Sequence, residues 1–128
     1  MLAGSRAAIH YYCGMKWNQL TDIAQLDIID KESAQGKVMI FKHSTRCSIS
    51  ATALNRVEKA WTAENDKLLT CYFLDLIAHR NISNAIADRY GVEHESPQVL
   101  IISKGKCIFS QTHLDISASE MLEATHSL

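Results

Sequence analysis

Cys47 is the residue of this sequence best placed for nucleophilic chemistry. It lies in KHSTRCSIS, residues 42–50, directly after the apolar run VMIF and directly before an amphipathic pattern. Cysteines that only pack usually lie inside apolar runs, whereas Cys47 has polar and cationic neighbours. The unpaired N–H groups and partial positive charge of a helix start favour a thiolate. We therefore predict a reactive thiol at a strand-to-helix junction; the alternative is a small helix-start residue without chemistry.

Three neighbours of Cys47 can support a thiolate. Ser50 follows three residues later, within one helical turn, so we expect its hydroxyl to donate a hydrogen bond to the Cys47 sulfur. His43 and Arg46 add positive charge nearby. The helix dipole alone contributes only about 0.3–1 kcal/mol, so these side chains are needed for a strongly activated thiol.

Helical periodicity and short apolar runs alternate along the chain. The predicted elements are a helix over residues 21–36, a strand over 38–41, a helix over 48–65, a strand over 67–74, a helix over 81–90, strands over 99–102 and 106–110, and a helix from 117. Thr21 can cap the first helix, with Ile23 on its apolar face, and Gly36 can end it. Gly91 is placed for a left-handed C-terminal cap of the helix over 81–90.

The two last strands and the last helix have specific local signals. Lys104-Gly105 is a short polar turn that predicts an antiparallel hairpin. Ser117 and Glu120 form an S-x-x-E capping box, and Ile116 and Met121 flank it as a hydrophobic staple. Alternating strands and helices that end in a hairpin predict an α/β fold, with a central mixed sheet of about four strands flanked by helices. This is the thioredoxin-like order, in which the loop after the first core strand carries the redox cysteine.

Pro97 is the one proline of the chain and stands immediately before the VLII strand in HESPQVLII. A buried strand tolerates proline only at its first residue. Most X–Pro bonds are trans, since only about 5–6% are cis. Thioredoxin-type folds nevertheless place a cis proline at this point, opposite the cysteine. The coincidence of Pro97 with Cys47 and with the strand order favours a cis bond here.

HSTRCSIS, with FK before it and ESPQVLII downstream, resembles the YtxJ family, the monothiol bacilliredoxins of the thioredoxin-like superfamily. The resemblance runs from about Trp17 to the last helix. It implies a thiol-disulfide oxidoreductase that removes bacillithiol, a small thiol carrying a malate group, from mixed disulfides on proteins. Cys47 is then the attacking thiol, and Ser50 occupies the place of the resolving cysteine of dithiol relatives. The residues expected to bind the substrate are His43, Thr45, Arg46, Ser96 and Pro97.

One position departs from the family pattern. Proline usually follows the cysteine in these relatives, and here that residue is Ser48. Proline would preset the first helical turn, so the preorganisation of Cys47 and the identity of the small thiol stay open. The cationic side chains of Lys42, His43 and Arg46 suit an anionic thiol, although such a trio is also common on solvated surfaces.

Composition excludes several other classes of protein. The 128 residues fit one domain, which we expect over residues 15–128 behind a loose N-terminal extension, residues 1–14. A net charge of −1 gives no general reason to bind nucleic acid or an anionic membrane. No apolar run predicts a membrane span or a secretory signal, so we expect a cytoplasmic protein. The client proteins, the reductant and the oligomeric state stay open.

The four cysteines do not form a metal or disulfide motif. They are Cys13, Cys47, Cys71 and Cys107, without a C-x-x-C pair, and the histidines show no H-x-x-H spacing. We expect no bound metal or cofactor, the small thiol being a co-substrate. Cys71 and Cys107 lie in apolar strands and are expected to pack, although Cys107 could resolve a disulfide if it faced Cys47.

Two further functions stay open beside the oxidoreductase. One is a redox-sensing or peptide-binding module of thioredoxin-like fold, in which a groove beside Pro97 holds a partner and Cys47 is oxidised as a signal without turnover. The other is carriage of an iron–sulfur cluster, although the cysteine motif of such monothiol relatives differs from RCSIS.

Overall fold

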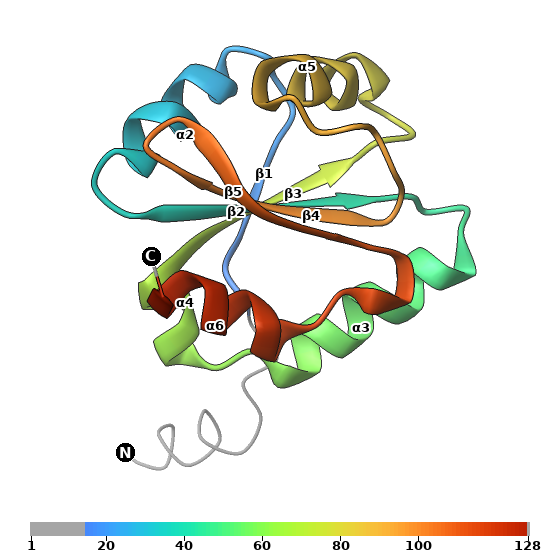
Figure 1. Cartoon of the computed structure of the whole chain (residues 1–128). Helices are drawn as coiled ribbons and strands as arrows, with labels where there is room; N and C mark the ends of the chain where they lie inside the picture. Colours follow the sequence, from blue (N-terminus) through green and yellow to red (C-terminus); the bar gives the residue numbers. More distant parts are fainter. Residues whose placement is uncertain (1–14, 128) are drawn as a thin grey trace, which may run out of the picture.

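A five-stranded mixed sheet runs through the middle of the molecule, with helices on both of its faces (Figure 1). The structure, a computed structural model, describes residues 15–127, so the predicted N-terminal extension lies outside the described residues. The strand order is β1-β3-β2-β4-β5, with β1, β3 and β2 parallel and the pairs β2–β4 and β4–β5 antiparallel. The predicted fold class is confirmed, with one strand more than the four or so expected.

The elements follow the predicted alternation. They are β1 (Trp17–Gln19), α2 (Gln25–Ser33), β2 (Lys37–His43), α3 (Ser48–Ala60), α4 (Ala63–Leu68), β3 (Leu69–Asp75), α5 (Arg80–Tyr90), β4 (Gln98–Ser103), β5 (Lys106–Thr112), the 3-10 helix η1 (His113–Asp115) and α6 (Ala118–Ser127). The additional strand, β1, lies at the sheet edge beside β3, and the side chain of Asn18 donates to the Cys71 carbonyl at 3.1 Å. Its three residues are too few for a periodic signal in the sequence.

β2 separates two hydrophobic cores. Met39 and Phe41 pack on the α3 and α6 side, while Val38 and Ile40 pack on the α2 and α5 side. All four are at most 1% exposed. Because both faces of the strand are covered, its sequence is a continuous apolar run instead of an alternating one.

The predicted helix over residues 48–65 is two helices. α3 stops before Trp61, whose backbone is extended at φ −79° and ψ 139°, and the indole is 2% exposed in the core below the sheet. Thr62 then caps α4 by accepting from the Asn65 N–H at 3.2 Å. The apolar spacing continues through the break, which is why periodicity alone predicted one helix, but the Thr62 cap starts a new one.

The start of the first helix also differs from the prediction. α2 begins at Gln25, not at Thr21, and Gln25 Oε1 accepts from the N–H groups of Thr21 and Asp22 at 2.7 and 2.9 Å. Gln25 thus binds two backbone donors that precede the helix, while Asp22 Oδ1 accepts from the Ala24 N–H at 2.9 Å, one of the donors that Thr21 was expected to cap. Ile23 precedes the helix and is 43% exposed, so its predicted place on the buried face is wrong. The helix also ends at Ser33, before Gly36.

The predicted turn and caps near the C-terminus are largely confirmed. Gly91 caps α5 in the left-handed region at φ 66°, and the β4–β5 turn has positive φ at Lys104 and Gly105, as a tight hairpin with the right-handed twist requires. Ser117 Oγ accepts from the Glu120 N–H at 3.3 Å. The reciprocal acceptor of the box is Gln111, whose side chain takes the Ser117 N–H at 3.0 Å.

We expect Ile40→Ala to lower the free energy of unfolding by about 2–5 kcal/mol, because a wholly buried side chain on the central strand leaves a cavity. Urea unfolding followed by circular dichroism measures this. Ile28→Ala is the matched control: Ile28 is 49% exposed, and the change should stay within about 0.5 kcal/mol. Equal costs for the two variants would contradict this assignment of the core.

Candidate active site

The strand-to-helix junction predicted for Cys47 is confirmed. β2 ends at His43, and Cys47 is the N-cap residue of α3, with extended φ −115° and ψ 121°. The Cys47 carbonyl accepts from the Ala51 N–H at 3.1 Å, and its own N–H donates to the Ser44 carbonyl at 3.2 Å. The thiol is free and half-buried. The side chain therefore stands at the open end of α3, where backbone N–H groups favour an anion.

Ser50 is wholly buried beneath this loop and joins it to the sheet. Its Oγ accepts from the Ser44 N–H at 3.0 Å and lies 2.7 Å from Nδ1 of His43. Among residues 15–127, the hydrogen bonds of this hydroxyl run to these two partners and none runs to the Cys47 sulfur. The predicted Ser50–Cys47 hydrogen bond is therefore absent from this arrangement, because the end of β2 reaches Ser50 first.

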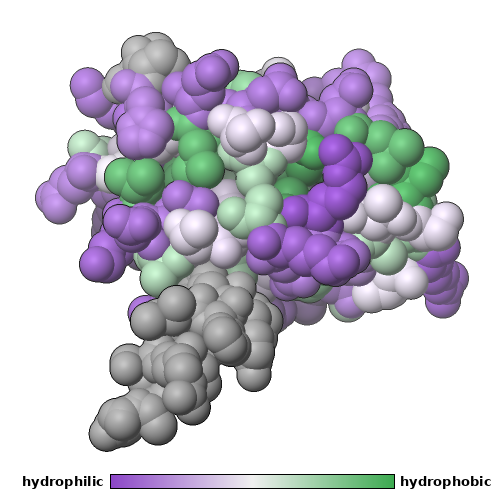
Figure 2. All heavy atoms as spheres, turned by 90° about the horizontal axis from the view of Figure 1, so that it is seen from below, coloured by the Kyte–Doolittle hydropathy of each residue, from purple (hydrophilic) through white to green (hydrophobic). Residues whose placement is uncertain are grey.

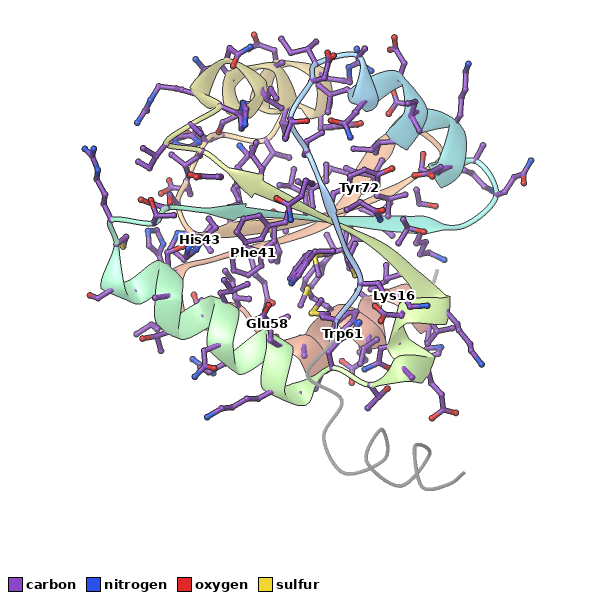
Figure 3. The ribbon with its side chains drawn as sticks, turned by 180° about the vertical axis from the view of Figure 1, so that it is seen from behind. Lys16, Phe41, His43, Glu58, Trp61 and Tyr72 are labelled. Atoms are coloured by element: carbon purple, nitrogen blue, oxygen red, sulfur yellow. The ribbon has the colours of Figure 1, made fainter. Side chains whose placement is uncertain are left out.

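His43 lies between the sheet and α3, in the region where Phe41 and Glu58 also lie (Figure 3). Its ring is 8% exposed, and its centroid is 5.4 Å from that of Phe73 and 6.4 Å from that of Phe41. Burial lowers the pKa of His43, while the carboxylates of Asp75 and Glu58 act in the opposite direction. The imidazole is thus mainly neutral at pH 7.

The cationic rim expected from Lys42, His43 and Arg46 is not formed. Lys42 is 0% exposed and lies on the opposite face of β2, where its ammonium donates to the Ser83 carbonyl of α5 at 3.3 Å. His43 is buried on the α3 side, so of the three only Arg46 is exposed, with Thr45 beside it. β2 extends two residues past its predicted end at residue 41. Because successive side chains of a strand point to opposite faces, Lys42 turns toward one core and His43 toward the other.

Pro97 lies at the same end of the sheet as Cys47. The Ser96–Pro97 peptide bond is cis, as the sequence analysis predicted. Lys42 pairs with Gln98 in the antiparallel register, so the next position along places buried Pro97 beside the end of β2. Ser96 is half-buried, and within the described part of the chain its Oγ has no hydrogen-bond partner.

The other described cysteines lie away from this loop. Cys71 is 1% exposed in the core, and burial raises the pKa of its thiol far above the ordinary value. Cys107 pairs with Ile102, which pairs with Val38, four residues along β2 from Lys42. At about 3.3 Å per residue, Cys107 lies roughly 13 Å along the sheet from the level of Lys42, near the end of β2 that leads to Cys47. Cys107 therefore does not face Cys47, and Cys13 lies outside the described residues.

Sequence reasoning missed three members of this site. Ser44 contributes its backbone N–H, and Asp75 and Glu58 contribute carboxylates near His43. Asp75 was detectable, because it ends the LTCYFLD strand, and parallel strands bring their carboxyl ends to one edge of the sheet. Glu58 was not, since its inward direction depends on how α3 packs against the sheet.

The remaining geometric features concern metals and membranes. Within residues 15–127, no three His, Cys, Asp or Glu side chains are grouped so that they could hold a metal ion. None of the helices in that part of the chain has the length and apolar character needed to cross a membrane.

Comparison with known proteins identifies related sequences and folds. The family model described as monothiol bacilliredoxin BrxC matches residues 18–121. A solved structure of a putative oxidoreductase with a thioredoxin fold is 31% identical, with a TM-score of 0.76 over 88% of this chain and 96% of that one. Thioredoxin from Malassezia sympodialis is 13% identical, with a TM-score of 0.69 over 88% and 90% of the two chains. Thioredoxin from Fasciola hepatica is 15% identical, with a TM-score of 0.64 over 86% and 97%.

We expect Lys42→Met to stabilise the protein at pH 7, because burial lowers the pKa of Lys42 from 10.5 to about 8. At about 1.4 kcal/mol per pKa unit, this corresponds to roughly 3 kcal/mol. Between pH 8 and 10.5 the folded state binds fewer protons than the unfolded state, so the stability of the wild type rises with pH.

Denaturant unfolding at several pH values should therefore show the gap between the Lys42→Met variant and the wild type narrowing above pH 8. Lys106→Met, at an exposed position of β5, is the matched control and should show no such narrowing. A constant difference between Lys42→Met and wild type would mean that Lys42 is hydrated in solution.

Proposed function

Since this chain belongs to the monothiol bacilliredoxin family, a family of thiol oxidoreductases, we propose that it removes bacillithiol, or a similar small thiol, from mixed disulfides on client proteins. One observation carries the proposal: a free, half-buried Cys47 occupies the N-cap position of α3, and a serine follows three residues later. Such a site can exchange a disulfide but cannot close one within its own helix turn.

The reaction is two thiol–disulfide exchanges. The Cys47 thiolate attacks the sulfur of the small thiol, a new S–S bond forms, and the mixed disulfide breaks. The client sulfur leaves as a thiolate and takes up a proton. A second thiol then attacks the Cys47-bound sulfur, carries the small thiol away as a disulfide and returns Cys47 to its reduced state. Cys47 supplies no net electrons, since the second thiol is the reductant.

The surroundings of Cys47 favour mixed disulfides over disulfides within proteins. Ser50 cannot act as a resolving thiol, and Cys107 lies at the other end of the sheet. The Cys47 adduct therefore lasts until an external thiol arrives, which suits a small-thiol carrier and slows the reduction of protein disulfides. Such a cycle needs a reducing compartment, and we propose that it runs in the cytoplasm.

Substrate recognition is proposed at the exposed part of the loop. Arg46 is the cation that this loop offers to solvent, and it can attract the malate carboxylates of bacillithiol. Thr45 beside it and Ser96-Pro97 at the end of β4 offer further polar and backbone contacts. His43 is removed from this group, because its ring is buried under the loop.

We expect the protein to take the small thiol from a client that carries a bacillithiol mixed disulfide. Intact-mass spectrometry should show the client reduced and one bacillithiol added at Cys47. Cys47→Ala should abolish transfer with the fold intact, whereas Cys107→Ala, which removes a thiol from the far end of the sheet, should leave it unchanged. A small thiol that stays on the client would favour the redox-sensing or peptide-binding module instead.

We expect Ser50→Cys to convert the site to a dithiol site, because residues three apart on a helix are neighbours. Under mild oxidation the variant should form a disulfide between Cys47 and the introduced cysteine, and it should retain the bacillithiol adduct for a shorter time, as thiol titration and intact mass would show. Ser48→Cys is the control, since adjacent helix positions do not face each other. A stable adduct in the Ser50→Cys variant would show that the two side chains do not meet.

A further inference from the structure

The hydroxyl of Ser50 contacts a buried imidazole and lies one helical turn from the Cys47 thiol. A serine hydroxyl has one hydrogen to donate and two lone pairs to accept with. One lone pair of Ser50 Oγ takes the Ser44 N–H, and the contact with His43 Nδ1, at 2.7 Å, is the shorter of the two. One hydrogen-bonding position of the hydroxyl then remains. Cys47 precedes Ser50 by three residues at the start of α3, a spacing at which side chains on a helix are neighbours.

His43 is a buried base with anionic support. Asp75 is its register partner on β3, and Glu58 faces it from α3. The rings of Phe41 and Phe73 lie beside it, with centroids 6.4 and 5.4 Å from that of the imidazole, and both are uncharged. Trp17 holds Glu58 in place, because its indole N–H donates to Oε2 at 2.8 Å. An imidazolium formed here would thus be stabilised by two carboxylates, while neutral His43 can accept a proton at Nδ1.

We propose that Cys47, Ser50 and His43 form a relay in which His43, acting through the Ser50 hydroxyl, removes and returns the proton of the Cys47 thiol. The Cys47 S–H bond breaks and its proton passes to Ser50 Oγ, while the hydroxyl proton of Ser50 passes to Nδ1 of His43. The products are a thiolate and an imidazolium, and no electrons are transferred. The imidazolium N–H then donates to Ser50 Oγ, and the Ser50 O–H is free to donate to the thiolate.

The relay gives the serine a task beyond replacing a resolving cysteine. When neutral His43 carries its proton on Nε2, the Ser50 hydroxyl donates to Nδ1 across the 2.7 Å contact. With protonated His43, the same hydroxyl turns to the Cys47 sulfur. When the client sulfur departs, the proton stored on His43 can return through Ser50. His43 is therefore a positioning residue, and the inference rests on the proposed function only in taking Cys47 as the nucleophile.

Cys47 alkylation by iodoacetamide, measured from about pH 5 to 9, tests the relay in the full-length protein without any disulfide substrate. Peptide mass spectrometry separates Cys47 from the other cysteines. We expect the wild-type rate to rise in two steps, because two coupled groups titrate. In His43→Asn, whose amide can still donate to Ser50 but cannot titrate, the rate should rise in one step. At pH 7 the alkylation rate of His43→Asn should be roughly tenfold lower than that of the wild type, the factor that corresponds to one hydrogen bond to a charged group.

Ser50→Ala should give the same loss, and the Ser50→Ala/His43→Asn double variant should lose no more than either, because the two residues act as a unit. His113→Asn is the matched control and should keep the alkylation profile of the wild type. His113 is exposed, and asparagine tolerates its φ of 55°. If His43→Asn does not fold, Asp75→Asn serves instead. It removes a carboxylate that stabilises the His43 imidazolium, so the step at lower pH in the Cys47 alkylation rate should become smaller.

Two-step alkylation that persists in His43→Asn, or additive losses in the double variant, would overturn the relay. This outcome is independent of the proposed function. A protein with an intact relay that leaves a bacillithiolated client unchanged would refute the substrate and keep the relay. If the wild type takes the small thiol from the client normally but its alkylation rate rises in one step, the relay is refuted and the substrate is kept.

Discussion

The buried hydroxyl of Ser50 is the constraint on which the rest of the site depends. It is bound by a backbone N–H of the loop and by a side chain from the end of β2, while its own backbone belongs to the first turn of α3. Strand, loop and helix thus meet at one oxygen. Because the hydroxyl binds both Ser44 and His43, the loop is anchored by groups other than the Cys47 thiol, which stays free and half-buried at the helix start.

The fold around this site is shared more widely than its chemistry. The thioredoxins compared above are only 13–15% identical to this chain, yet their TM-scores are 0.64–0.69. A likeness at that level concerns the arrangement of strands and helices and not the reaction. The chemistry that we propose for this chain rests on a few residues between β2 and α3 and at its first turn.

On the α3, α4 and α6 side of the molecule, hydrophobic residues form separate areas among hydrophilic ones (Figure 2).

Local signals predicted the frame of the site well. Short stretches of sequence indicate the apolar run before Cys47, the helix after it and the proline before β4. The strand-to-helix junction and the cis bond at Pro97 could therefore be predicted. The directions of Lys42 and His43 could not. They depend on where β2 stops pairing with β3 and β4, and the register extends to His43, past the last apolar residue. Long-range pairing therefore overrode the rule that charged side chains lie outside.

The buried ammonium of Lys42 has a consequence for local opening. Most of a strand resists separation because apolar side chains would be hydrated, but hydration of an ammonium is favourable and offsets part of that cost. The offset acts at the last pleat of β2 before the reactive loop, next to the pairing of β2 with β4. The end of the sheet where we propose that the mixed disulfide binds is thus an end where hydration of Lys42 lowers the cost of separating the strands, and amide hydrogens there should exchange with solvent sooner than those near Met39.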